Sequence, residues 1–151
     1  MKRIGLVVCA AALCLSTRAL AAAAVAPEEG AWIPPSPETI AIVDEGDKGY
    51  AIRHFPSRLR LYTFDRDSRG VSRCVEGCAS AWPPVLAPAG AHPVGDWSLV
   101  PRSDSGPQWA YKGQPVYVRY HDLPDAPSGD GVDGLWRLVP PIPKTARPGR
   151  G

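Results

Sequence analysis

Apolar and polar residues alternate along much of the chain between residues 39 and 120. The segment TIAIVD at 39–44 alternates, and after the turn-forming residues EGDKG the alternation returns in YAIRHF at 50–55 and LRLYTF at 59–64. A period of two places every second side chain on the same face of a β-strand. The pattern therefore predicts a meander of short antiparallel strands.

A second alternating region lies in QWAY at 108–111 and PVYVRY at 115–120. These segments flank Lys112-Gly113, where glycine can adopt the positive φ of a tight hairpin turn. Eighteen prolines argue against long helices. Only Ser72–Ala81 favours a helix, with Ser72 as its N-cap and Pro83 just beyond its end. The sequence thus predicts a mainly β fold, a small antiparallel β domain with one short helix near residues 73–81.

Two windows of the chain carry the same anchors at nearly the same intervals. Tyr62 is followed five residues later by Asp67, and Tyr117 is followed five residues later by Asp122. A tryptophan closes each window, twenty residues after the first tyrosine and nineteen after the second. This repetition predicts two related units, at about 50–101 and 102–139.

The predicted core takes apolar and aromatic residues from both units. Its members are Ile40, Ile42, Tyr62, Phe64, Trp82, Val85, Trp97, Trp109, Tyr111, Tyr117 and Trp136.

The N-terminal sequence is typical of export. Lys2 and Arg3 precede an apolar run and then small residues that fit a cleavage site, which predicts a signal peptide at 1–21. We expect an extended, proline-rich leader at 22–38, the β domain at 39–139 and a disordered tail at 140–151. No later apolar stretch reaches about twenty residues, so no transmembrane segment is predicted in the mature chain. Cys9 and Cys14 lack the small preceding residue of a lipid-anchor signal, and we expect a periplasmic or secreted protein without a lipid anchor.

Cleavage changes the charge balance. Loss of residues 1–21 removes three basic residues and no acidic one, which takes the formal net charge from +2 to −1. No run of Lys or Arg lies beside aromatic residues, so nucleic-acid binding is not predicted.

Cys74 and Cys78 are the two cysteines that remain after cleavage. In an oxidising compartment such a pair is usually a disulfide, although a metal site or a redox switch are alternatives. Residues four apart on a helix hold their Cβ atoms about 5–6 Å apart, whereas a disulfide needs about 3.8 Å. We predict a structural disulfide, with a local distortion at Gly77, that pins the helix so that Trp82 enters the core.

The repeated motif residues have two interpretations. Tyr62 and Phe64 share one face of a strand, which places them in the core, with Asp67 tying the turn that follows. The alternative is a binding site built from both units, and its candidate residues are Tyr62, Phe64, Asp67, Trp82, Tyr117, Asp122 and Trp136.

Other chemistry finds little support. Asp125, Asp130 and Asp133 lie among glycines and are weak calcium candidates, but their spacing does not match an EF-hand. No histidine neighbours a cysteine, and no nucleophile elbow or phosphate-binding glycine loop is present. We therefore predict no metal, no cofactor and no enzymatic activity.

The residues Tyr62-Thr63-Phe64-Asp65-Arg66-Asp67 fit a Yx(F/W/Y)xxD motif, and CVEGCASAWPPV follows them. Through these residues the chain resembles a bacterial family of predicted lipoproteins called the secreted repeat of unknown function. The resemblance covers about residues 40–139. Arg119 stands at the aromatic position of the second motif. The resemblance implies an envelope location and brings no established activity. We expect a non-catalytic module that binds an envelope protein or a small ligand, or alternatively a redox or metal-binding accessory protein that uses Cys74 and Cys78.

Overall fold

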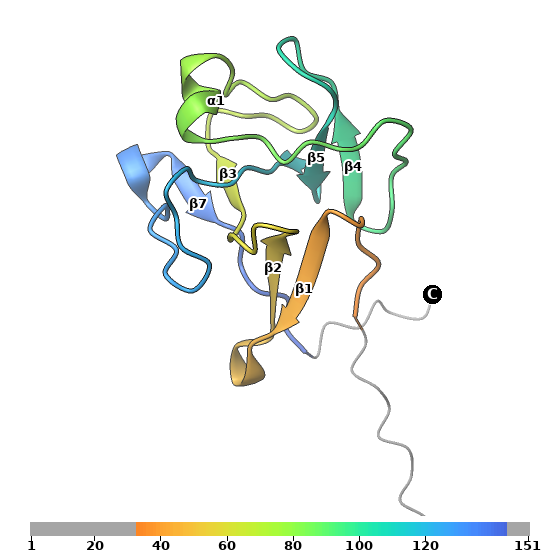
Figure 1. Ribbon diagram of the computed structural model, residues 1–151, viewed down its shortest axis with the longest axis vertical. Helices are drawn as coiled ribbons and strands as arrows, with labels where there is room; N and C mark the ends of the chain where they lie inside the picture. The colour runs from red at the N-terminus through yellow and green to blue at the C-terminus, as the bar shows by residue number, and fades with distance from the viewer. Residues whose placement is uncertain (1–32, 145–151) are drawn as a thin grey trace, which may run out of the picture. The chain divides into compact units, whose positions relative to one another are not determined.

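The alternating segments form three small antiparallel sheets (Figure 1). The computed structural model describes residues 33–144, so the predicted signal peptide and most of the leader lie outside the described residues. The strands are β1 (Ile40–Asp44), β2 (Tyr50–His54), β3 (Tyr62–Phe64), β4 (Trp97–Val100), β5 (Gln108–Tyr111), β6 (Gln114–Pro115) and β7 (Trp136–Leu138). The helical elements are α1 (Gly77–Ala81) and two 3-10 turns, η1 (Gly46–Lys48) and η2 (Val132–Gly134). The prediction of a mainly β fold with one short helix is confirmed.

The sheets pair segments that are both near and far in sequence. β1 pairs with β2 and β4 pairs with β5, which in turn pairs with β6 through the predicted hairpin turn. Lys112 has a φ of 50° and Gly113 a φ of 85°, the two positive values that a tight hairpin requires. β3 pairs with β7, so the first tyrosine motif lies beside the end of the domain.

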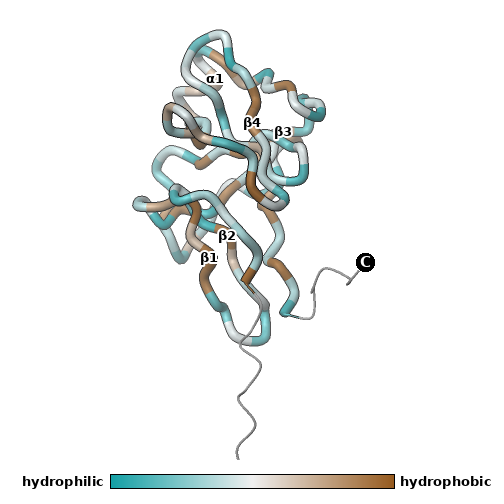
Figure 2. Tube along the Cα trace, turned by 90° about the vertical axis from the view of Figure 1, so that its right-hand side faces the viewer, coloured by the Kyte–Doolittle hydropathy of each residue, from teal (hydrophilic) through white to brown (hydrophobic). Residues whose placement is uncertain are grey.

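Two clusters of buried residues form the core, and hydrophobic positions on β1 and β2 stand out in Figure 2. The first cluster packs Trp97 and Trp109 with aliphatic side chains, and the second gathers most of the remaining buried aromatic rings. All predicted core residues are buried except Ile42 and Tyr111, which are partly buried and pack against the first cluster.

The C-terminal segment differs from the expected disordered tail. Ile142 exchanges two backbone hydrogen bonds of 2.8 Å with Tyr50 and packs against the first cluster. Gly49, with a φ of 92°, lets this segment approach closely, because a Cβ atom at position 49 would collide with the Ile142 carbonyl. Lys144 forms an ion pair with Asp44. The chain is therefore structured up to residue 144, and residues 145–151 lie outside the described part.

The short helix begins later than predicted. α1 starts at Gly77, and Ser72 does not cap it, because the Ser72 hydroxyl bonds with the Tyr117 hydroxyl and Arg102 instead. Glu76 has a φ of 51°, which breaks any regular helix that precedes Gly77. The distortion that the disulfide needs thus falls on Glu76 rather than on Gly77. Among residues 33–144, no helix has the length and apolar character needed to cross a membrane.

Candidate functional site

The two motif tyrosines lie side by side in the core. Tyr62 and Tyr117 are both fully buried and exchange two backbone hydrogen bonds of 2.9 Å. The Tyr62 hydroxyl donates to Asp122 Oδ2 at 2.5 Å, and the Tyr117 hydroxyl donates to Asp67 Oδ2 at 2.7 Å. Each tyrosine is therefore bonded to the aspartate of the other motif.

Each aspartate also closes the turn that follows it. Asp67 Oδ1 accepts the backbone N–H of Arg73 at 2.7 Å, and Asp122 Oδ1 accepts that of Ser128 at 2.8 Å. In both cases the amide lies six residues after the carboxylate. Such side-chain to backbone bonds are how aspartates stabilise turns. One carboxylate thus orders its own loop and satisfies the other motif's hydroxyl.

The tryptophans complete this arrangement. Trp82 and Trp136 stack with ring centroids 3.7 Å apart and planes 5° from parallel. Tyr62 meets Trp82 edge-on at 5.3 Å, and Tyr117 meets Trp136 edge-on at 5.3 Å. Stacked and edge-to-face rings are favourable aromatic geometries, so the four rings form one compact block.

The outer side of each tryptophan carries a different partner. Phe64 stacks on Trp136 at 4.5 Å. Arg119, at the corresponding place in the second motif, sets its guanidinium 5.5 Å from the centre of the Trp82 ring. A guanidinium over an indole face makes a cation–π contact, so Arg119 covers the Trp82 ring as Phe64 covers that of Trp136.

Protons stay on the tyrosines of this block. Burial raises the pKa of both hydroxyls, and the hydrogen bond from Tyr62 to Asp122 raises the pKa of Tyr62 further. Burial also raises the pKa of the Asp67 carboxyl, despite hydrogen bonds from the Arg73 amide and the Tyr117 hydroxyl. All seven motif candidates are therefore brought together, and they contact one another in the interior.

Cys74 and Cys78 form the predicted disulfide, with Cα atoms 5.1 Å apart. Cys74 is fully buried, and its carbonyl accepts a hydrogen bond of 2.8 Å from Arg102 Nη2. Trp82, four residues after Cys78, enters the core as expected. Arg102, which sequence reasoning did not single out, thus connects the disulfide loop to the rest of the domain.

The aspartates proposed as weak calcium ligands do not converge. Asp125 pairs with Arg53, Asp130 accepts the backbone N–H of Leu138 at 2.8 Å, and Asp133 lies in η2. Among the described residues, no group of three His, Cys, Asp or Glu side chains is placed to hold a metal ion.

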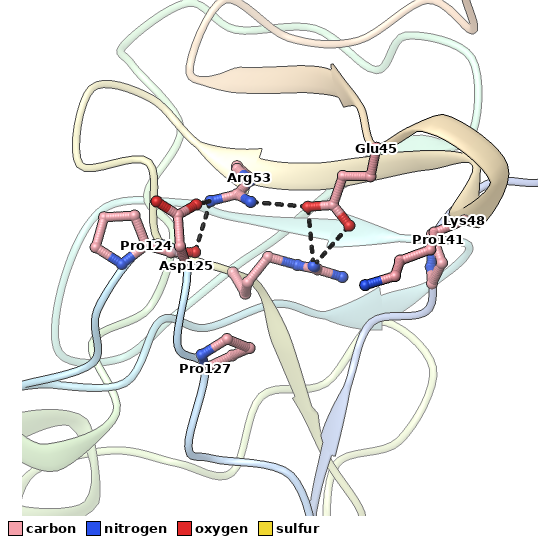
Figure 3. A pocket seen from close by; sticks show the side chains of 8 residues that line it. Glu45, Lys48, Arg53, Pro124, Asp125, Pro127 and Pro141 are labelled. Carbon is pink, nitrogen blue, oxygen red and sulfur yellow. Dashed lines mark hydrogen bonds and ion pairs between the residues drawn. The ribbon is translucent and has the colours of Figure 1, made fainter.

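A cavity of about 510 Å³ opens beside the β1–β2 hairpin (Figure 3). Its floor carries two arginines, Arg53 and Arg60, that lie opposite each other on antiparallel backbone. Like charges directly across a strand pair are destabilising, so this placement requires a counter-charge. The full set of lining residues is Glu45, Lys48, Arg53, Arg60, Pro124, Asp125, Pro127 and Pro141.

Glu45 supplies that counter-charge to both arginines. It accepts a bond of 2.7 Å from Arg53 Nη2, and both its oxygens lie 3.3 Å from Arg60 Nη1. The side chains of Arg53 and Arg60 are only 7% and 9% exposed. Buried charges are costly unless they are well paired, so the quality of this pairing matters.

The two arginines are not equally well paired. Arg53 Nη1 also bonds to the carbonyls of Pro124 and Arg58 and to Asp125. Arg60 bonds only to Glu45 among residues 33–144, whereas the buried Nε atoms of both arginines have no partner there. Arg60 therefore places a buried, incompletely neutralised charge on the floor of this cavity.

Sequence reasoning missed this site. Arg53 and Arg60 stand at polar positions of alternating segments, where such a pattern places side chains toward solvent. The one signal in the sequence was the position of Arg60 between two leucines, Leu59 and Leu61. The other residues that line the cavity lie in distant parts of the chain, among them the turn between β1 and β2 and the loop at 124–127.

The structure also brings one serine to one histidine. His54 Nδ1 lies 2.7 Å from Ser57 Oγ, and burial lowers the pKa of His54. The same hydroxyl accepts the backbone N–H of Leu59 at 3.4 Å. Both partners belong to one tight turn, and such local contacts are typical of serine in turns.

Comparison with known proteins yields one family. A secreted repeat of unknown function matches residues 60–86, which hold the first tyrosine motif, both cysteines and Trp82. The expected resemblance is confirmed over this segment, which is shorter than the range of 40–139 inferred from sequence. No curated protein and no solved structure matches the chain. The match fits an exported protein of unknown activity.

Proposed function

We propose that the mature chain is a non-catalytic binding module of the cell envelope, periplasmic or secreted and without a lipid anchor. The match to a secreted repeat over residues 60–86 supports the location. The single observation that supports binding is Arg60, a buried and incompletely paired cation on the floor of the cavity beside β1 and β2. Such convergent polar groups in a cavity define a candidate binding site.

The motif block serves as the scaffold of this module. Its tyrosines, aspartates and tryptophans satisfy one another in the interior, and the cavity beside β1 and β2 is the one with buried arginines in its lining among the cavities described for residues 33–144. We further infer that the two units arose by duplication. Tyr62 pairs with Leu138, two residues after Trp136, and Tyr117 pairs with Pro84, two residues after Trp82, so each tyrosine pairs at the same place in the other unit. A crystal structure whose two units fail to superpose would contradict this inference.

The binding proposal is tested by NMR on isotope-labelled mature protein titrated with fractions of envelope extract. We expect at least one fraction to shift the amide signals of the residues that line the cavity, including Lys48 and Asp125. The matched control is Lys112→Gln, which removes an exposed lysine outside the cavity and should leave these shifts unchanged. Reproducible absence of any shift, with all fractions, would contradict the proposal.

The redox alternative requires a cysteine sulfur that an attacking thiolate can reach. Cys74 is fully buried and Cys78 only half-buried, which favours a structural role for the pair. Measurement of its reduction potential, with elemental analysis of the native protein, separates the two functions. A potential as oxidising as those of catalytic disulfides would favour the accessory protein.

The absence of catalysis is tested at the His54–Ser57 contact, the arrangement most like a nucleophile with its base. In serine hydrolases a third group orients the histidine, and donors stabilise the oxyanion. Among residues 33–144, the only side-chain hydrogen bond of His54 is the one to Ser57. We expect no hydrolysis of activated esters above background, and activity that Ser57→Ala abolishes would overturn the non-catalytic proposal.

A further inference from the structure

We propose that the cavity beside β1 and β2 binds a small organic carboxylate, an anion of single charge on a compact apolar body, through Arg60 and Lys48. This inference rests on the proposed binding function and names the class of its ligand. It follows from three features of the cavity, which are its charge balance, its free donors and the character of its walls.

The charge balance leaves one positive charge uncompensated. The lining residues include three cations, Lys48, Arg53 and Arg60, and two carboxylates, Glu45 and Asp125. Asp125, at 85% exposed, and Lys48 are both screened by water, so the buried part of the balance is Arg53 and Arg60 against Glu45, which again leaves one positive charge in excess. A ligand with one negative charge neutralises the excess, whereas a dianion such as a phosphate monoester exceeds it.

The free donors lie on Arg60 and Lys48. Arg60 uses Nη1 for Glu45, and its Nη2 makes no hydrogen bond to any of residues 33–144. Lys48 is exposed at the end of η1, forms no ion pair within the described residues, and extends toward the same cavity in Figure 3. Charge-assisted hydrogen bonds to a carboxylate are among the strongest that proteins form. One carboxylate can thus engage both groups without displacing Glu45.

The walls favour an apolar body behind the anionic head. Pro124, Pro127 and Pro141 line the cavity, and a proline ring offers apolar surface and no N–H donor. The proline backbone is also restricted, so the walls are largely pre-formed. A volume of about 510 Å³ lies within the range of small-molecule sites.

The experiment is a calorimetric and NMR titration of the mature protein with four probes: cyclohexanecarboxylate, its neutral amide cyclohexanecarboxamide, acetate and inorganic phosphate. We expect cyclohexanecarboxylate to bind most tightly and to shift the amide signals of the cavity. Acetate lacks the apolar body and should bind more weakly. The amide has the same shape without the charge, and we expect it not to bind.

Two variants assign the contacts. Lys48→Gln removes one charge-assisted hydrogen bond and should weaken binding of cyclohexanecarboxylate about tenfold. Its matched control is Lys112→Gln, which removes an exposed lysine outside the cavity and should leave the affinity unchanged. Arg60→Gln should abolish binding, and its circular dichroism and thermal unfolding report whether this buried position still folds. Because Lys48 is exposed, its variant keeps the proposal testable even if the Arg60 variant does not fold.

The outcomes separate this inference from the proposed function. Equal binding of the acid and its amide, or an affinity that Lys48→Gln leaves unchanged, overturns the carboxylate site. Phosphate binding without carboxylate binding also overturns it, while the binding module stands. If no probe binds but envelope fractions still shift the cavity signals, only the ligand class is wrong. If neither probes nor fractions bind, both proposals fall.

Discussion

Tyr62 and Tyr117 are paired through two backbone hydrogen bonds of 2.9 Å, and each donates its hydroxyl to the aspartate that follows the other tyrosine. Neither motif therefore satisfies its own buried groups. The carboxylate that Tyr62 needs lies sixty residues away, and the one that Tyr117 needs lies fifty residues away. Because the two motifs exchange these bonds, disruption of one is expected to weaken the packing of both.

Tyr62→Phe should lower the free energy of unfolding by about 1–3 kcal/mol, because it leaves buried polar groups without a partner. The variant removes the donor to Asp122 Oδ2 and the acceptor of the Gly129 amide. Urea denaturation monitored by tryptophan fluorescence measures the change. Tyr120→Phe is the matched control, since Tyr120 is 61% exposed and its variant should stay within about 0.5 kcal/mol of the wild type.

The crossed pairing itself is tested by double-mutant cycles. Tyr62→Phe combined with Asp122→Asn should show a coupling energy of about 0.5–3 kcal/mol, as residues in direct contact do. The same tyrosine variant combined with Asp67→Asn should be closer to additive, because the Asp67 carboxylate bonds to Tyr117. A stronger coupling of Tyr62 to Asp67 than to Asp122 would contradict the exchange.

The raised pKa of Asp67 predicts a direction for the pH dependence of stability. Burial lifts the pKa of this carboxyl above its ordinary value of 3.8, so between these two pKa values the native state binds more protons than the unfolded state. Its contribution to the free energy of unfolding is therefore full below pH 3.8 and falls as the pH rises through the native pKa. The difference between wild type and Asp67→Asn should decrease with pH in this window.

Asp44→Asn serves as the control of opposite sign. The hydrogen bond from Lys144, aided by that from the Gly46 amide, lowers the pKa of Asp44. The unfolded state then binds more protons, so the difference between wild type and this variant should rise with pH, weakly because the pair is exposed to solvent. Denaturation at a series of pH values measures both slopes, and a rising difference for Asp67→Asn would refute the assignment.

The disulfide between Cys74 and Cys78 should contribute about 2 kcal/mol or somewhat less to the free energy of unfolding, because the loop that it closes is short. Comparison of oxidised with reduced wild-type protein measures this without any change of side chain. Thiol counting on folded protein from an oxidising compartment should find no free thiol among the mature residues. Two free thiols without reductant would rule out the structural disulfide.

Gly129→Ala should destabilise the protein by about 1–3 kcal/mol, the usual cost of overpacking a core. An added Cβ would come within 2.6 Å of the Tyr62 ring and 2.8 Å of the Trp82 ring. Gly77→Ala is the control, because a Cβ there meets nothing within 4 Å. Thermal unfolding compares the stability of the two variants. Equal stability would show that the Tyr62 and Trp82 rings can shift to make room for the added Cβ atom.

Arg102→Met should lower the free energy of unfolding by about 3 kcal/mol or more, because it removes the cation that donates the hydrogen bonds of a buried network. The Arg102 side chain is fully buried and donates to Ser72, Cys74, Asp104, Ser105 and Gln108. Arg137→Met is the comparison, since the ion pair of Arg137 with Asp65 is half-exposed and should contribute about 1 kcal/mol or less. Equal losses in urea denaturation would argue against a structural role for Arg102.

The sequence alone determined the local elements and the identity of the anchors. Alternation in TIAIVD and YAIRHF predicted β1 and β2, because a period of two is intrinsic to the extended backbone. Lys112-Gly113 predicted a hairpin, since its positive φ values are a local property of the turn. The spacing of Cys74 and Cys78, in a chain expected to be exported, predicted a disulfide, because only three residues separate the two cysteines.

Only the tertiary structure decided which groups meet. Tyr62 donates to Asp122 rather than to Asp67, and Glu45 pairs with both Arg53 and Arg60, which stand at polar positions of the alternating segments. The Ser72 hydroxyl forms a hydrogen bond with the Tyr117 hydroxyl and does not cap a helix. Ile142 forms backbone hydrogen bonds with Tyr50, although the sequence predicted a disordered tail there. Local periodicity specifies the face of a strand on which a side chain lies. The partner that covers that face comes from residues far along the chain, and the free energy of that packing overrides the local preference.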